Sequence, residues 1–399
     1  MTRLWDKGQP LDERVLRYTA GEDHRLDERL VPYDIRGSVA HAEMLCLRKL
    51  LSQADCESIC NGLQQLGKDF ADGKWQIEMV DEDAHTALES RLTRLIGDAG
   101  ARLHLGRSRN DQVLTALRLY MMDAAGDIAD KAGELCAALD DLAERQGSVV
   151  LPGYTHMQQA MPSSVLLWSS GFREALQDDI AGLRGTHRRS ARNPLGSAAG
   201  YGTPSLPIDR QMTTTKLGFA DTQEPVTAVQ LSRGKAECTL LFELTLLMQD
   251  LGRLASDLLL FYTEEFGYVR LKPEVTTGSS IMPQKRNPDV LELVRAASAT
   301  AQGCLDEGLM ITAKLPSGYQ RDLQRLKAPL FRGIDLASDS IEVMSRLVSG
   351  LEFVPERIRL SAGLYAAEQA NRLVVEEGIP FREAYRRIAA LHGAGKDEA

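Results

Sequence analysis

Apolar residues in the middle of the chain recur at helical spacing. Between Asp111 and Gln146 they follow one another in steps of three and four, at Val113, Leu117, Met121, Ala124, Ile128, Ala132, Leu135, Leu139 and Leu142. This spacing places them on one face of an α-helix, which at 1.5 Å per residue is roughly 50 Å long. Residues 164–190 and 231–266 form two more long segments of this kind. Long helices bury such stripes by packing together, so the pattern predicts an elongated helix bundle.

The remainder of the chain divides into connecting segments and shorter helices. Gly, Pro, Ser and Thr are concentrated in three segments that we expect to be ordered loops, residues 151–162, 193–209 and 272–288. Shorter helices are predicted before the bundle, and two more over residues 355–373 and 381–391. We therefore expect an all-α protein with three domains. These are a mostly helical N-terminal domain (1–106), a central long-helix bundle (107–354) and a short helical C-terminal domain (355–399).

Composition and charge narrow the class of protein. The 399 residues include 47 Lys and Arg against 56 Asp and Glu, a net charge of −9, which argues against a nucleic-acid-binding protein. No apolar run is long enough to span a membrane, and the first six residues lack the apolar core of a signal peptide. The six cysteines form no CxxC pair and no zinc spacing. We expect a cytoplasmic protein without bound metal.

Three segments between or beside the predicted helices carry candidate chemistry. The first is TTGSSIMPQKRNP at 276–288, a Gly/Ser loop with two cations that leads into a helix, where backbone N–H groups attract an anion. The second is PGYTHMQ at 152–158, in which His156 follows a hydroxyl group. The third is HLGRSRNDQ at 104–112, where Asp111 suits the N-cap of the long helix. Taken singly, each also has a purely structural interpretation: a solvated linker, a hydrogen-bonding histidine and a helix cap.

Together these segments resemble a known group of enzymes. The string at 276–288 closely matches the GSSxMPxKxN loop of the fumarase/aspartase superfamily, whose members release fumarate from a succinyl-type substrate. GRSRNDQ, GYTH, YDIRGS at 33–38, HTALESR at 85–91 and GYQRDLQ at 318–324 resemble argininosuccinate lyases, the family to which delta-crystallins are also related. The resemblance runs from about residue 4 to residue 390.

The sequence departs from the family pattern in three places. TAGED at 19–23 stands where the family has a substrate-binding serine, and Arg325-Leu326 replaces an acidic pair. The C-terminal domain is shorter than is typical of the family. The first departure leaves one substrate contact unassigned.

The resemblance implies a reversible β-elimination of argininosuccinate to fumarate and arginine, a reaction of arginine biosynthesis. Such a reaction needs a base, positive charge beside the developing dianion, and an acid for the leaving nitrogen. By resemblance, Ser279 is the base, Lys285 the neighbouring cation and Asn287 a neutral donor. His156 is the acid, oriented by Glu292. The residues alone leave open which of Ser279 and His156 is base and which is acid.

The resemblance also implies the substrate-binding residues. Ser108, Asn110 and Thr155 would donate to the substrate carboxylates, with Arg109 adding charge nearby. The remainder of the substrate would contact Tyr319, Gln324 and Lys327. Residues 83–91 are expected to border the site. No cofactor and no metal is implied, because no step transfers electrons or requires a carbon electron sink.

The sequence leaves two alternatives to argininosuccinate cleavage open. Another N-substituted aspartate, such as adenylosuccinate, could be the substrate, or the protein could be a crystallin-like structural homologue.

Asn110 and His156 lie at opposite ends of a helix roughly 50 Å long, so one chain cannot bring both to one active site. We expect a homotetramer with sites shared between subunits, as the resemblance also implies.

Overall fold

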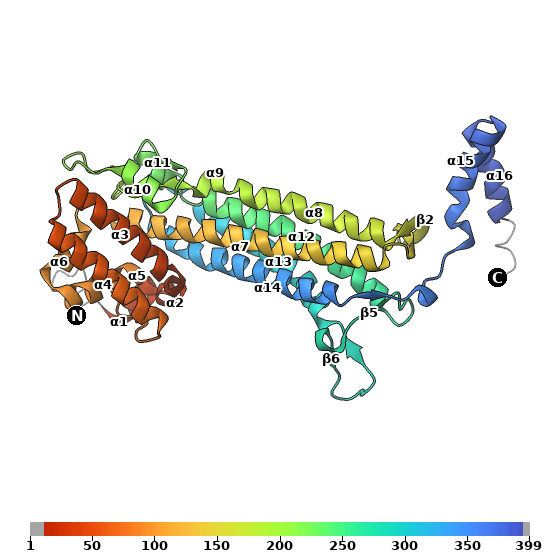
Figure 1. The fold of residues 1–399 in the computed structure, drawn as a ribbon, viewed down its shortest axis with the longest axis horizontal. Helices are drawn as coiled ribbons and strands as arrows, with labels where there is room; N and C mark the ends of the chain where they lie inside the picture. The colour runs from red at the N-terminus through yellow and green to blue at the C-terminus, as the bar shows by residue number, and fades with distance from the viewer. Residues whose placement is uncertain (1–11, 394–399) are drawn as a thin grey trace. The chain divides into compact units, whose positions relative to one another are not determined.

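Long helices dominate the structure (Figure 1). The computed structural model describes residues 12–393. Its long helices are α7 (Arg109–Gln146), α8 (Val165–Gly185), α12 (Lys235–Tyr262), α13 (Asp289–Thr312) and α14 (Lys327–Ser349). The predicted all-α fold built on long helices is confirmed. The first eleven residues, for which we expect no signal peptide, lie outside the described part of the chain.

Shorter elements accompany the long helices. The shorter helices are α1 (Glu13–Ala20), α2 (Asp23–Leu26), α3 (Val31–Leu47), α4 (Gln53–Ala71), α5 (Ala84–Ile96), α6 (Asp98–Ala101), α9 (His187–Ser190), α10 (Arg210–Leu217), α11 (Thr227–Leu231), α15 (Ala366–Glu377) and α16 (Phe381–Gly393). Short strands form two-stranded pairs: β1 (Val150–Thr155) with β2 (Gln158–Ser164), β3 (Arg192–Asn193) with β4 (Asp221–Thr222), β5 (Val269–Arg270) with β8 (Glu352–Phe353), and β6 (Thr277–Gly278) with β7 (Arg286–Asn287).

The chain forms two compact units. The first comprises residues up to Ala129, Ala181–Thr245 and Thr300–Ala337; the second comprises Asp130–Ile180, Leu246–Ala299 and the residues from Ser338 onward. Each long helix contributes residues to both units. The division into three domains at residues 106/107 and 354/355 stays a prediction.

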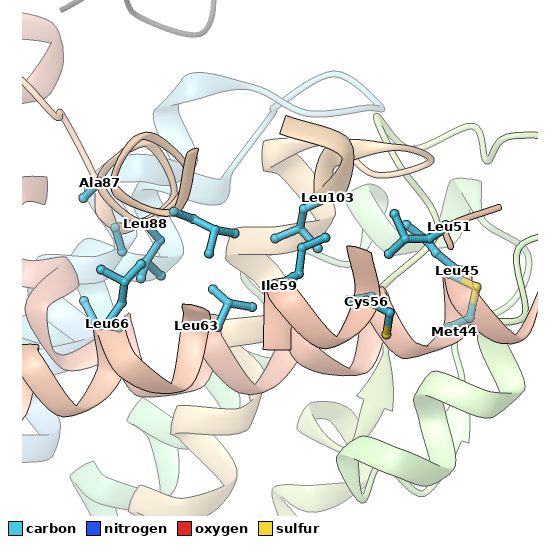
Figure 2. Close-up of a cluster of buried hydrophobic side chains, with 14 of the residues drawn as sticks. Met44, Leu45, Leu51, Cys56, Ile59, Leu63, Leu66, Ala87, Leu88 and Leu103 are labelled. Carbon is cyan, nitrogen blue, oxygen red and sulfur yellow. The ribbon is translucent and has the colours of Figure 1, made fainter. Parts of the chain in front are cut away.

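The core of the first unit shows how helix periodicity builds the fold. Helix α4 begins after Ser52, whose Oγ accepts the N–H of Asp55 at 3.1 Å as a helix N-cap. Its buried residues Cys56, Ile59, Leu63 and Leu66 recur every three or four positions and face α3 and α5 (Figure 2). Fully burying each large apolar side chain contributes about 1.5–3 kcal/mol.

A glycine sets the spacing of α4 against α5. A Cβ atom at Gly62 would come within 2.8 Å of Leu92 Cδ1 and 3.2 Å of Ile96 Cγ2. A larger residue would therefore force the side chains of Leu92 and Ile96 to move, which would disturb the packing of α4 against α5.

Two local predictions were wrong. Residues 151–162 form most of the antiparallel hairpin β1–β2 rather than a loop. His156 and Met157 connect its strands with φ angles of 52° and 60°, both in the left-handed region, as in a type I′ turn. The helix predicted from residue 355 begins only at Ala366, because short 3-10 turns and extended residues occupy the segment before it.

Candidate active site

The first unit contains a polar cavity of about 180 Å³ where α7 begins. Residues from α2, α5, α7 and the segment leading into α14 line it. Its lining residues are Ala20, Asp23, Glu82, Asp83, His85, Arg109, Asn110, Val113, Arg233, Tyr319, Arg321, Leu323, Gln324 and Lys327. We call this the substrate pocket. The predicted binding residues Arg109, Asn110, Tyr319, Gln324 and Lys327 all lie in it.

The start of α7 is fixed by reciprocal hydrogen bonds between Ser108 and Asp111. The Oγ of Ser108 accepts the N–H of Asn110 at 3.3 Å, and the carboxylate of Asp111 accepts the N–H of Ser108 at 2.9 Å. The helix begins at Arg109, so Ser108 is its N-cap and the prediction of Asp111 there was wrong. Burial raises the pKa of Asp111 to about 6, even though it also accepts the N–H groups of Gly196 and Ala198. This clamp directs Arg109 and Asn110 toward the pocket.

Opposite charges meet on one wall of the pocket. Arg109 forms a close ion pair with Asp83, and its Nη2 lies 3.9 Å from Glu82 Oε2. Arg321 Nη2 lies 3.8 Å from the same Glu82 oxygen. Burial disfavours the charged form of Asp83, but His85 and Arg109 outweigh it and lower its pKa to about 2. The wall therefore offers guanidinium groups held in place by buried carboxylates.

His85 is a buried imidazole oriented by a carboxylate. Its Nδ1 lies 2.6 Å from Asp34 Oδ2, and both side chains are at most 2% exposed. Gln112 donates to the other oxygen of Asp34 at 2.8 Å. Burial opposes charge on both groups, yet the pairing raises the pKa of His85 and lowers that of Asp34. His85 Nε2 has no hydrogen-bond partner among the described residues.

Lys327 already has two carboxylate partners. Its Nζ lies 2.7 Å from Asp23 and 2.6 Å from Asp27, and the side chain is buried. Burial opposes its charge, but the two carboxylates raise its pKa. Burial also raises the pKa of Asp23 to about 6, against the effect of Lys327. Lys327 thus ties α2 to α14 as well as lining the pocket.

The segment before α14 completes the pocket. Gln324 Nε2 donates to the backbone oxygen of Thr19 at 2.9 Å, as does Arg321 Nη2. The guanidinium of Arg233 lies 6.0 Å from the ring centre of Tyr319. Residues 19–23, which replace the family's serine segment, therefore reach the site, and two of them, Ala20 and Asp23, line it.

The other predicted site residues belong to the second unit. Ser279 lies in the loop between β6 and β7, and its Oγ accepts the N–H groups of Ile281 at 3.3 Å and Met282 at 3.1 Å. Lys285 is exposed in the same loop, and Asn287 donates to the Gly278 oxygen at 3.4 Å. Glu292 is exposed on the first turn of α13.

Thr155 and His156 are exposed at the end of the β1–β2 hairpin. The predicted residues thus form two groups, one in each unit. Ser108, Arg109, Asn110, Tyr319, Gln324 and Lys327 belong to the first, and Thr155, His156, Ser279, Lys285, Asn287 and Glu292 to the second.

Several pocket residues were not singled out from the sequence. Glu82, Arg233 and Arg321 line the cavity, but only Arg321 lies inside a quoted motif. Glu82 is distinguished only in the structure, where its backbone φ of 68° is unusual for a residue other than glycine.

In the part of the chain that is described, no group of three or more His, Cys, Asp or Glu residues could hold a metal ion. None of the described helices is long and apolar enough to cross a membrane.

Comparison with solved structures defines the class of protein. An EDDS lyase in complex with formate superposes with a TM-score of 0.82 at 25% identity, covering 98% of this chain and 78% of that one. A class II fumarase from Schistosoma mansoni gives a TM-score of 0.78 at 20% identity, covering 95% and 88%. The fold is that of the fumarase/aspartase-like lyases.

Sequence comparison defines the family. The family described as Lyase matches residues 10–303. An argininosuccinate lyase from Sorangium cellulosum is 46% identical over 97% of this chain and 90% of that protein. Another from Thermotoga neapolitana is 40% identical over 99% of both chains. The chain belongs to the argininosuccinate lyase family.

Proposed function

We propose that the protein cleaves argininosuccinate to fumarate and arginine, as a step of arginine biosynthesis in the cytoplasm. The observation that carries the proposal is the convergence of two distant motifs, GRSRNDQ and GYQRDLQ, on one pocket. The guanidinium groups of the pocket are suited to bind the carboxylates of argininosuccinate. The carboxylates of Asp23, Glu82 and Asp83 are suited to bind the cationic guanidinium end of argininosuccinate. The identity of 40–46% to argininosuccinate lyases supports this assignment.

The chemical step falls to the loop between β6 and β7. Removal of a proton next to a carboxylate leaves an unstable dianion, which requires fixed positive charge beside it. We assign Ser279 as the base, because the two N–H groups that its Oγ accepts would favour an alkoxide. Lys285 supplies charge at the dianion, and Asn287 supplies a neutral donor.

The leaving nitrogen requires a proton from an acid. We assign this role to His156, which is exposed at the tip of the β1–β2 turn, with Glu292 orienting the imidazole. His156 and Met157 both adopt left-handed backbone angles, each at a cost of order 1–3 kcal/mol. Ser108, Asn110 and Thr155 would bind the substrate carboxylates.

We propose that the active site is assembled from several copies in a homotetramer. Helix α7 is continuous over 38 residues, which corresponds to roughly 57 Å, and it separates Asn110 from His156 in the chain. Large apolar side chains are exposed on the long helices, at Leu166, Leu167, Phe242, Leu246, Leu293, Leu309 and Met310. Packing between copies would bury them and bring opposite helix ends together.

A substrate panel tests the reaction. Purified protein is offered argininosuccinate, adenylosuccinate and EDDS, and fumarate release is followed by its ultraviolet absorbance with and without a chelator. EDDS is included because of the structural likeness to an EDDS lyase. We expect fumarate from argininosuccinate at a rate that the chelator does not change. Faster cleavage of another substrate, or loss of activity with chelator, would contradict the proposal.

A further inference from the structure

The first unit holds a second cavity, of about 260 Å³, which shares no lining residue with the substrate pocket. It lies beside α7, α9 and the connection between α11 and α12. Its lining residues are Arg118, Arg189, Arg192, Gln223, Ala228, Leu231, Ser232, Lys235 and Ala236. Four of these are cationic, and none of the described residues that line it is acidic. We call it the basic cavity.

Arg118 is the buried centre of the basic cavity. Only 2% of the residue is exposed. Its guanidinium donates to the backbone oxygen of Arg192, to Gln223 Oε1 at 2.6 Å and to Ser232 Oγ at 3.2 Å. These partners are all uncharged, and its Nε is buried without a hydrogen-bond partner among the described residues. Burial lowers the pKa of Arg118 to about 10, so the group remains charged at neutral pH.

Two nearby carboxylates already have cationic partners, one of them the cavity residue Arg192. Asp221 lies 3.1 Å from Arg192 on the exposed side. Glu237 acts on Arg118 through space, but it accepts the N–H of Gly234 at 2.9 Å and lies 3.6 Å from Arg233. Among the described residues named here, two carboxylates thus stand against five cations, Arg233 included, and Arg118, Arg189 and Lys235 have neither as an ion-pair partner. Burying a cation without a counter-charge is costly, so an anion in the cavity would be stabilised.

We propose that the basic cavity binds a phosphate group, either as inorganic phosphate or as the phosphoryl end of a small phosphomonoester. Guanidinium groups form paired hydrogen bonds with phosphate oxygens, and three of them line this cavity. The volume equals that of several water molecules at about 30 Å³ each, more than one phosphate requires. Ala228, Leu231 and Ala236 offer apolar surface for an attached carbon group.

Isothermal titration calorimetry on the whole 399-residue chain tests the proposal. Inorganic phosphate and glycerol 1-phosphate are titrated separately at pH 7.5 and low ionic strength, into the wild type and the Arg189→Gln and Lys235→Gln variants. Neither side chain is buried, so both variants should fold. The matched control is Arg188→Gln, which alters an exposed neighbour that does not line the cavity. Arg321→Gln removes a cation from the substrate pocket instead.

We expect saturable binding of one phosphate per chain in the wild type. Each cavity variant should bind it about tenfold or more weakly, because a charge-assisted hydrogen bond is lost. Arg188→Gln and Arg321→Gln should bind it as the wild type does. Tighter binding of glycerol 1-phosphate than of inorganic phosphate would identify a phosphomonoester as the ligand, and the reverse order would identify free phosphate. Absence of saturable binding, equal weakening in Arg188→Gln, or weakening only in Arg321→Gln would overturn the proposal.

Discussion

The charge of Asp83 should stabilise the folded protein by an amount that can be measured. Asp83 is 7% exposed, forms an ion pair with Arg109, and accepts the N–H of Thr86 at 2.9 Å as the N-cap of α5. Its pKa falls from 3.8 to about 2. At 1.36 kcal/mol per pKa unit, the ionised carboxylate contributes about 2 kcal/mol. Asp83→Asn keeps an oxygen for the cap and replaces the charged oxygen that faces Arg109 by a neutral NH2 group.

Asp209→Asn provides a matched control. Asp209 is the N-cap of α10 and accepts the N–H of Met212 at 2.9 Å, but among the described residues its carboxylate has no cationic partner within ion-pair distance. Urea unfolding at one fixed protein concentration would compare the two variants with the wild type. We expect a loss of about 2 kcal/mol for Asp83→Asn and less than about 1 kcal/mol for Asp209→Asn, the usual value of charge at a helix end.

The pH dependence follows from the direction of the pKa shift. A depressed carboxylate pKa gives stability that is present above the unfolded value of 3.8 and is lost as pH falls through about 2. The contribution of Asp83 itself should therefore be the same at pH 5 and pH 6.5, whereas Asp23, whose pKa of about 6 is raised partly by Asp83, adds its own pH dependence to the difference. Equal losses in Asp83→Asn and Asp209→Asn would refute the electrostatic argument.

Two further predictions concern the base and a buried histidine. Ser279→Ala should lose nearly all of kcat while still binding substrate, because a base acts mainly in the transition state. Ser280→Ala should lose much less of kcat. Steady-state kinetics and substrate-binding calorimetry measure both effects, and an equal loss of kcat in the two variants would mean that the base is misassigned. His41 is buried with a pKa lowered to about 3, so its contribution is present above pH 6.5 and is lost as pH falls toward 3. From pH 7 to pH 5 the wild type should therefore lose about 2 kcal/mol of unfolding free energy that His41→Gln does not lose. If urea unfolding shows the same loss of unfolding free energy from pH 7 to pH 5 in the wild type and in His41→Gln, this reasoning is contradicted. His187→Gln, at an exposed position, serves as the control.

The sequence predicted the long helices because their periodicity extends over many turns. The helix predicted over residues 111–146 is α7, which begins two residues earlier. Its first turn was misplaced because Ser108 and Asp111 are both good capping residues, and only their hydrogen bonds decide between them. The β1–β2 hairpin was missed because its strands lack alternating apolar residues and Pro152 faces Pro162 across the ladder.

The candidate site was predicted motif by motif, but its electrostatics depend on contacts between distant segments. No local pattern indicates that Lys327 pairs with Asp23 and Asp27, some 300 residues earlier. Arg233 lies outside every motif that resembles the family, and only the fold brings it beside Tyr319. Spacing along a chain predicts which face of a helix a residue occupies; it does not predict which other element meets that face.

The central claim is that each active site combines residues of different copies of the chain. Mixed tetramers test this claim most directly. His156→Asn and Ser279→Ala proteins are dissociated, mixed in equal amounts and reassembled, and fumarate release from argininosuccinate is compared with each parent treated alone. Asparagine is chosen because it tolerates the left-handed backbone of residue 156. If the two residues come from different subunits, random mixing restores about a quarter of the sites to wild type. Recovery near a quarter of wild-type activity is the predicted result. Verified hybrids that stay inactive would place His156 and Ser279 on one chain, and a monomer in solution would contradict the shared site altogether.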